Sequence, residues 1–151
     1  MDEFVGSTRV EKIKGVNAKR LVKKGEKARI LYVDFHEDCQ SLIKNIALRN
    51  NWEITSAPDG IEGLKLLEKN LDSLSAVFLE PKHSKVEKIQ LIRTFREKTK
   101  TSELHLPIVV ISAFAMLDQK HSFLAAGADF YFPKPLNGKD LKALINELVF
   151  M

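Results

Sequence analysis

The 151-residue sequence has a single cysteine, Cys39, so it cannot form a disulfide within the chain. Its four histidines are scattered and the cysteine has no CxxC partner, which argues against a zinc site. The longest apolar stretch, residues 106–117, is about a dozen residues long, well short of the ~20 that span a bilayer. The amino terminus lacks the apolar run of a signal peptide. These absences favour a protein of the reducing cytoplasm with no membrane partner.

Hydrophobic residues make up 44% of the chain and charged residues 29%, which suits one soluble domain. The net charge of +4 is uneven, because residues 1–29 hold nine Lys or Arg against four acids, whereas the remainder holds 15 against 16. We therefore predict a basic amino-terminal tail, residues 1–27, and a folded domain, residues 28–151. We expect the tail to be a solvated extension that is partly disordered or becomes ordered on a partner. The alternative is that the tail binds nucleic acid or an acidic surface, which its positive charge would suit.

Apolar runs and amphipathic stretches alternate along residues 28–149. We expect strands at 28–33, 52–57, 75–79, 107–111 and 129–132, and helices at 39–50, 61–69, 86–98, 117–126 and 140–149. Asp38 is expected to cap the first helix, and Leu42 and Ile61 to lie on apolar helix faces. This alternation predicts an α/β fold, a doubly wound five-stranded parallel sheet with helices on both faces.

Four of the expected strands end in a reactive or charged residue, namely Asp34, Glu80, Ser112 and Lys134. Because the carboxyl ends of parallel strands lie on one edge of the sheet, these side chains should converge there. Glu80 follows the apolar run Ala76–Leu79 and precedes Pro81, which cannot continue a strand ladder. The sequence thus predicts a site at this edge, centred on Glu80.

The chain resembles the receiver (CheY-like) domains of response regulators over residues 28–150. The resemblance is carried by Ile-Leu-Tyr-Val-Asp34, Ala57-Pro-Asp-Gly60, Val-Phe-Leu-Glu80, Gln90-Leu-Ile-Arg93, Pro107-Ile-Val-Val-Ile-Ser-Ala113, and the blocks from Ala125 to Asp129 and from Tyr131 to Pro135. It implies the flavodoxin-like strand order 2-1-3-4-5 and a cis bond before Pro135. We expect a signalling domain and not an enzyme.

A working receiver phosphorylates an aspartate at the end of its third strand and binds Mg²⁺ with that aspartate and an acidic pair ending its first strand. By resemblance, Glu80 occupies the acceptor position and Phe35 replaces the second acid, so that only Asp34 of the pair remains. We expect no cofactor, because Mg²⁺ needs oxygen ligands in near-octahedral geometry. Glu37 or Asp38 could lend an oxygen, which leaves weak Mg²⁺ binding through Asp34 and Glu80 open. His83-Ser84 replaces the family's Met-Pro in the next loop.

The resemblance also implies that the other half of the receiver machinery is kept. Ser112 matches the hydroxyl that contacts the phosphoryl group, Lys134 the lysine that pairs with it, and Tyr131 the aromatic residue that moves with the switch. We hypothesise an ion pair between Glu80 and Lys134. Glu80 then either mimics the phosphorylated state or is a drifted acid that only neutralises Lys134.

Our interpretation is a pseudo-receiver, a phosphorylation-independent protein-interaction or signalling module of a two-component-type pathway. The alternatives are a residually phosphorylatable, Mg²⁺-dependent response regulator, and binding of nucleic acid or an acidic partner through residues 1–27. A protein partner is expected on the face made by residues 117–126, 130–132 and 140–151. The aromatic run Phe130–Phe132 either supplies binding hot spots there or packs internally.

Overall fold

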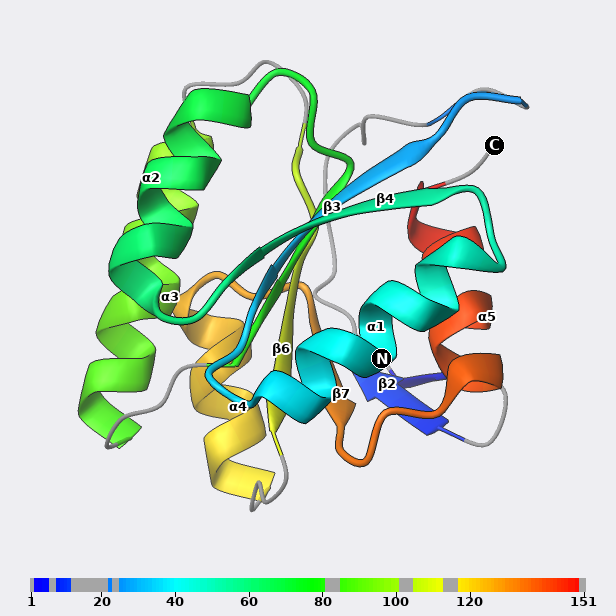
Figure 1. The fold of residues 1–151 in the computed structure, drawn as a ribbon. Helices are drawn as coiled ribbons and strands as arrows, with labels where there is room; N and C mark the ends of the chain where they lie inside the picture. The colour runs from blue at the N-terminus through cyan, green and yellow to red at the C-terminus, as the bar shows by residue number, and fades with distance from the viewer. Residues whose placement is uncertain are drawn as a thin grey trace.

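A computed structural model of the chain describes residues 2–5, 8–11, 22, 25–80, 85–100, 105–112 and 117–149. Its main body is a five-stranded, wholly parallel sheet in the order β4-β3-β5-β6-β7 (Figure 1). The order confirms the predicted 2-1-3-4-5 arrangement. Its elements are β3 (Ala28–Val33), α1 (Glu37–Leu48), β4 (Trp52–Ala57), α2 (Gly60–Asn70), β5 (Ala76–Leu79), α3 (Lys85–Thr99), β6 (Ile108–Ser112), α4 (Leu117–Ala126), β7 (Phe130–Pro133) and α5 (Gly138–Val149).

Helices cover both faces of the sheet, as the alternating pattern predicts. Helices α1 and α5 lie on the right of the sheet in Figure 1, and α2, α3 and α4 lie on its left. Successive strand residues point to opposite faces. In β3, Ile30 and Tyr32 therefore pack with α1 and α5, whereas Leu31 and Val33 pack in the other cluster with Leu67 of α2. The central strands β5 and β6 are buried along their whole length, which explains their continuous apolar sequences.

Local sequence fixes several element ends. The Asp59 carboxylate accepts a hydrogen bond from the Glu62 amide at 2.9 Å and caps α2. The Asn137 side chain accepts bonds from the amides of Lys139 and Asp140 and caps α5 in the same way. At the end of α4, Gly127 has a φ of +123°, a conformation that favours glycine. These residues fix where α2 and α5 begin and where α4 ends, whereas the parallel topology of the sheet gathers the strand-to-helix loops at its carboxyl edge.

Four local predictions are wrong. Helix α1 begins at Glu37, two residues earlier than expected, and its N-cap position is His36 rather than Asp38, with no side-chain capping bond. Asp38 lies exposed in the first turn, where its charge favours the helix dipole. Leu42 and Ile61 are 41% and 71% exposed, because the faces of α1 and α2 that pack on the sheet are those of Ile43 and Ala47 and of Gly63 and Leu67.

The amino-terminal region contains a short antiparallel hairpin, β1 (Asp2–Val5) and β2 (Thr8–Glu11). Strand β2 lies beside β7, and β1 lies beside α5. Farther along, the amide of Val22 donates a 2.7 Å bond to the carbonyl of Val149, and Val22 is buried in the α1–α5 cluster. Parts of the predicted tail therefore have defined structure, and its other residues lie outside the described part of the chain.

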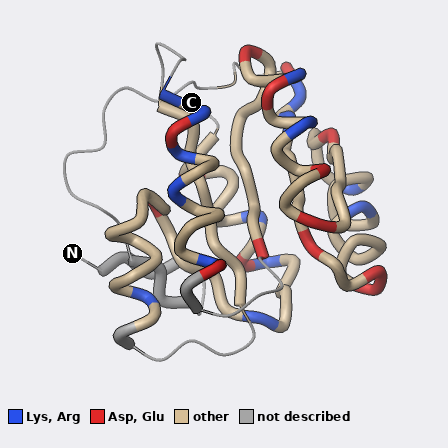
Figure 2. The backbone as a smooth tube through the Cα atoms, turned by 90° about the vertical axis from the view of Figure 1, so that its left-hand side faces the viewer, with Lys and Arg blue, Asp and Glu red and all other residues tan. Residues whose placement is uncertain are grey.

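Acidic and basic positions are interspersed along the helices of the main body (Figure 2). Exposed ion pairs join Glu62 to Lys65 within α2, and Glu68 of α2 to Lys98 of α3. This mixing agrees with the near-zero charge of residues 30–151 and gives the helices a surface suited to solvent. Among the described residues, we find no helix that could cross a bilayer.

Candidate functional site

The register of the sheet brings three of the predicted site residues together. Val33 pairs with Leu79 across β3 and β5, so Asp34 and Glu80 leave neighbouring strands at the same level. The amide of Glu80 donates to the Val33 carbonyl at 2.8 Å, which holds the two strand ends in place. Lys134 follows β7, two strands away from β5, and its amide is anchored by the Ser112 carbonyl at 2.9 Å. Its long side chain reaches back to both carboxylates.

The ammonium of Lys134 lies between the two acids. Its Nζ is 2.9 Å from Asp34 Oδ2 and forms an ion pair with Glu80 Oε2, which confirms the hypothesised Glu80–Lys134 pair. All three side chains are nearly inaccessible, with exposed fractions of 0% for Asp34 and 9% for both Glu80 and Lys134. The predicted cis peptide bond between Lys134 and Pro135 is also present. Two buried carboxylates thus share one buried cation.

Asp34 is the most strongly held of the three charges. Its Oδ2 accepts a hydrogen bond from the Tyr32 hydroxyl at 2.7 Å, and its Oδ1 accepts one from the His36 amide at 2.9 Å. Burial alone would raise the pKa of Asp34, but these donors and Lys134 outweigh it and lower the pKa below its usual range. Asp34 is therefore the carboxylate that stays ionised.

The pKa of Glu80 shifts in the opposite direction to that of Asp34. Burial raises the pKa of Glu80, and the attraction of Lys134 is too small to reverse that, since the Asp34 charge opposes ionisation as well. Burial would lower the pKa of Lys134, but Glu80 and Asp34 together raise it. The trio is thus built around a firmly charged lysine, a firmly charged aspartate and a glutamate that ionises less readily.

The structure adds site residues that the sequence analysis missed. His36 Nδ1 lies 2.9 Å from Asp34 Oδ1, 3.0 Å from Lys134 Nζ and 3.8 Å from Glu80 Oε2. The ring of Phe35 packs on that of His36, with centroids 3.8 Å apart. Gln40 donates to the Asp34 carbonyl at 2.5 Å. His36 was within reach of sequence reasoning, because it lies two residues beyond Asp34 on the same strand-end loop.

The carboxylate contacts bear directly on the Mg²⁺ that the family resemblance implies. Both oxygens of Asp34 already accept hydrogen bonds from protein donors, and Glu80 Oε2 faces an ammonium. Phe35 contributes a ring at the position of the second acid, and Glu37 and Asp38 are exposed on α1. Octahedral Mg²⁺ needs several oxygens that are free to bind it. The described residues do not suit that ion.

The remaining predicted residues lie on the last two strands of the sheet, Ser112 at the end of β6 and Tyr131 within β7. Tyr131 is buried, and its hydroxyl donates to the Ser112 carbonyl at 3.3 Å. The Lys120 ammonium lies 5.6 Å from the centre of the Tyr131 ring. Phe130 and Phe132 are also buried, in the cluster with α5. The aromatic run of β7 therefore packs internally, which is the second of the two alternatives given for it. His83 and Ser84 lie outside the described residues.

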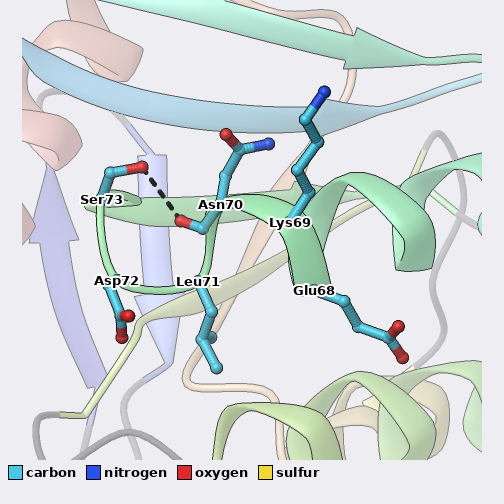
Figure 3. Close-up of a pocket in the computed structure, with 6 residues that line it drawn as sticks. All are labelled: Glu68, Lys69, Asn70, Leu71, Asp72 and Ser73. Carbon is cyan, nitrogen blue, oxygen red and sulfur yellow. Dashed lines mark hydrogen bonds between the residues drawn. The ribbon is translucent and has the colours of Figure 1, made fainter.

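A hollow of about 580 Å³ lies far from this site in the fold. It surrounds the turn between α2 and β5, at the amino-terminal edge of the sheet, and is lined by Glu68, Lys69, Asn70, Leu71, Asp72 and Ser73 (Figure 3). The Ser73 hydroxyl closes the turn by donating to the Asn70 carbonyl at 3.1 Å. This hydrogen bond accounts for the shape of the turn, and we assign the hollow no function.

A doubly wound α/β domain with a lysine and two acids at the carboxyl ends of its strands has the architecture of a signalling receiver. The chain belongs to the response regulator receiver family, and residues 30–146 match the sequence model of the response regulator receiver domain.

Curated relatives agree with this assignment. The chain is 32% identical over 129 residues to Histidine kinase P4 of Formosa agariphila, an alignment that covers 85% of this chain and 9% of the kinase. It is 26% identical over 121 residues to the transcriptional regulatory protein CpxR of Escherichia coli, covering 80% of this chain and 49% of CpxR. The chain thus spans half or less of the length of these relatives.

Solved structures show the same fold. A two-component response regulator from Clostridium difficile superposes with a TM-score of 0.70 at 24% identity, covering 80% of this chain and 94% of that one. The receiver domain of Saccharomyces cerevisiae Ssk1, solved in complex with the histidine phosphotransfer protein Ypd1, gives 0.62 at 21% identity, covering 82% and 87%.

Proposed function

We propose that this domain is a pseudo-receiver, a protein-interaction module of a two-component-type pathway that works without being phosphorylated. The observation that carries the proposal is the buried ion pair of Lys134 with Glu80 and Asp34. In this reading Glu80 stands at the acceptor position of the family. Its carboxylate is already engaged by the lysine that would otherwise pair with a phosphoryl group.

The geometry argues against phosphoryl transfer on three counts. Transfer depends on positioning and on metal-assisted charge stabilisation. Glu80 carries one methylene more than aspartate, which displaces the nucleophilic oxygen. Phe35 supplies no metal ligand, and the Asp34 oxygens are taken by Tyr32 and His36. A residually phosphorylatable, Mg²⁺-dependent regulator would have to overcome all three.

A small phosphodonor tests this directly. The protein is incubated with acetyl phosphate and Mg²⁺ and its intact mass is measured. We expect no adduct of one phosphoryl group on the wild type. The double variant Phe35→Asp, Glu80→Asp restores the acidic pair and the acceptor, so it serves as a positive control that should gain the adduct. A wild-type adduct that disappears in Glu80→Gln would overturn the proposal.

Glu80 either mimics the phosphorylated state or only neutralises Lys134. The packing of Tyr131 against the Ser112 carbonyl places the candidate switch residue inside the fold, which supports a domain held in one conformer. Mimicry predicts that Glu80→Ala shifts the NMR signals of Ser112 and Tyr131, although neither residue is altered. Signals that move only at Lys134 and its immediate neighbours would favour simple neutralisation.

We further propose that the partner is a protein that binds at the face of α4, β7 and α5. The complex of the Ssk1 receiver with a histidine phosphotransfer protein supports a protein of that class as the first candidate. The hairpin of β1 and β2 lies beside part of this face and would border the partner. Titrating the labelled domain with such a protein should perturb amide signals in α4 and α5. Perturbations confined to the ends of β3 and β5 would contradict the assignment of the face.

A further inference from the structure

A second hollow, of about 440 Å³, lies at the end of the sheet remote from β7. It is formed where the second half of α1 packs beside the start of β4, the first strand in the sheet order (Figure 1). A volume of this size is within the range of sites that bind a small molecule, and it is sufficient for a few side chains. The hollow shares no residue with the Lys134 site or with the face of α4, β7 and α5.

The floor of the hollow is apolar. Ala47 of α1 and Trp52 of β4 are buried, and Ile54 is half-buried. Leu48, at the rim, is 84% exposed, the largest fraction among the large hydrophobic residues that the structure describes. An exposed leucine that continues a surface of tryptophan and isoleucine is suited to contact with another apolar group.

The backbone of β4 offers hydrogen bonds at the same place. The carbonyls of Asn51 and Ala57 accept bonds from amides of β3 and of the residue after it, so the odd-numbered residues of this segment bond to β3. The even-numbered residues, Trp52, Ile54 and Ser56, therefore turn their N–H and C=O groups outward. No described strand pairs with that side of β4.

This edge lacks the features that usually protect an unpaired strand, which are lysine, proline or a β-bulge. The sequence of β4, Trp-Glu-Ile-Thr-Ser-Ala, contains neither lysine nor proline, and its six residues pair with β3 without a bulge. The edge beside the hollow is therefore open to a further strand.

Two lysines determine which kind of strand would fit. Lys27, just before β3, and Lys44, one turn before Leu48, border the hollow and are exposed. Within the described part of the chain, neither ammonium has a hydrogen-bond or ion-pair partner. Glu53 also borders the hollow, but its side chain alternates to the other face of the sheet. Carboxylates would complement the charge of the hollow.

We propose that the β4 edge binds an extended segment of a partner protein in which an apolar side chain has a carboxylate two residues away on either side. The segment adds a sixth strand to the sheet by pairing with Trp52, Ile54 and Ser56. Residues two apart on a strand point to the same face, so the apolar side chain and the carboxylates enter the hollow together. A partner bound here leaves the face of α4, β7 and α5 open, and the proposal does not depend on the proposed function.

A palindromic heptapeptide, acetyl-Thr-Asp-Thr-Leu-Thr-Asp-Thr-amide, is the probe, because it presents the same side chains in parallel and antiparallel pairing. Its binding to the full-length chain is followed by the fluorescence of Trp52, the only tryptophan of the sequence. We expect a saturable change in emission. The same peptide with lysine in place of both aspartates is the matched control and should bind about tenfold more weakly or less.

Amide hydrogen exchange, measured by NMR, distinguishes strand addition from other modes of binding. At saturating peptide the outward-facing amides of Trp52, Ile54 and Ser56 should gain protection. The amides of Glu53 and Thr55 already bond to β3 and should change little. Equal gains at odd and even positions, or no gain, would overturn the proposed mode of binding.

Substitutions locate the peptide on the surface. Lys27→Glu and Lys44→Glu should each weaken binding about threefold or more, whereas Lys142→Glu makes the same charge change at an exposed position of α5 and should not. Leu48→Ser should also weaken binding, whereas Ile61→Ser, at a 71% exposed position of α2, should leave it unchanged. Equal effects within these matched sets would show that the peptide binds elsewhere.

A second copy of this chain is the competing occupant, because its own β4 could pair with the edge. Sedimentation of the wild type at micromolar concentration should give a monomer. A dimer that Leu48→Ser dissociates would assign the edge to self-association and overturn the proposal. The absence of any peptide binding at millimolar concentration would overturn it as well.

Discussion

Lys134 Nζ lies 2.9 Å from Asp34 Oδ2, and this contact joins the first strand of the parallel sheet to the loop that follows its last strand. The two residues meet because the sheet order places β3 and β7 on either side of β5 and β6, with all carboxyl ends on one edge. The contact closes the site across the sheet. Because the charges of the site are buried and paired, changing any of them should alter the free energy of unfolding of the domain.

Replacing Asp34 should destabilise the domain more than replacing Glu80. Asp34→Asn removes the charge that Tyr32, His36 and Lys134 all stabilise, and we expect a loss of about 1–3 kcal/mol in the free energy of unfolding. Glu80→Gln leaves Asp34 to neutralise Lys134, so its cost should be smaller. Urea unfolding of the three proteins at neutral pH measures the difference. A larger loss in Glu80→Gln would mean that Glu80 is the main partner of Lys134.

Asp34 and Glu80 should make the stability of the domain depend on pH in opposite ways. The pKa of Asp34 is lowered in the folded state, so its stabilisation is present above its ordinary value, about pH 4, and is lost as the pH falls through the native pKa. The pKa of Glu80 is raised, so its stabilisation is present below about pH 4.3 and is lost as the pH rises through the native pKa.

Unfolding midpoints between about pH 3 and pH 7 separate these effects. The advantage of the wild type over Asp34→Asn should shrink toward the acidic end. Glu80→Gln should gain relative to the wild type as the pH rises above about 4.3. Parallel curves for the wild type and both variants would show that neither pKa differs between the folded and unfolded states.

At the amino-terminal edge of the sheet, Arg96 of α3 joins the segments that precede β6 and β7. Its guanidinium donates to the carbonyls of Gly127 and Leu106 and to the Asp129 carboxylate, at 2.8, 2.9 and 2.7 Å. A lysine cannot make these divergent bonds, so Arg96→Lys should cost about 2–3 kcal/mol in urea unfolding. Arg93→Lys, at an exposed position of the same helix, is the matched control and should change stability little. Equal effects of the two substitutions would contradict a special role for Arg96.

Two glycines should respond differently to alanine. Gly127 has a φ of +123°, and a Cβ there would lie 2.9 Å from both Cβ and Cγ of Arg96. Gly127→Ala should therefore cost about 1–3 kcal/mol. At Gly138, in the first turn of α5, the nearest atom to a Cβ is 3.7 Å away, so Gly138→Ala should be neutral or stabilising by up to about 1 kcal/mol. Thermal unfolding of the pair distinguishes strain from a general intolerance of alanine.

Much of the fold could be read from local pattern. The continuous apolar runs of β5 and β6 and the 3.6-residue periodicity of the helices determine element type and a sheet buried on both faces. Element ends were less certain, as the early start of α1 shows. The position of a helix end depends on small differences between alternative backbone hydrogen bonds. His36 occupies the N-cap position of α1 without a side-chain hydrogen bond, so its residue type did not indicate where the helix begins.

The sequence by itself determined that Asp34, Glu80, Ser112 and Lys134 would stand at strand ends, because the strands are marked by composition. It did not determine which of them touch. Only the tertiary structure placed the Lys134 ammonium against Asp34, Glu80 and His36, since contact depends on strand register and on the reach of one long side chain across β6. The burial of Phe130–Phe132 was decided in the same way, by what packs over β7 rather than by the aromatic run itself.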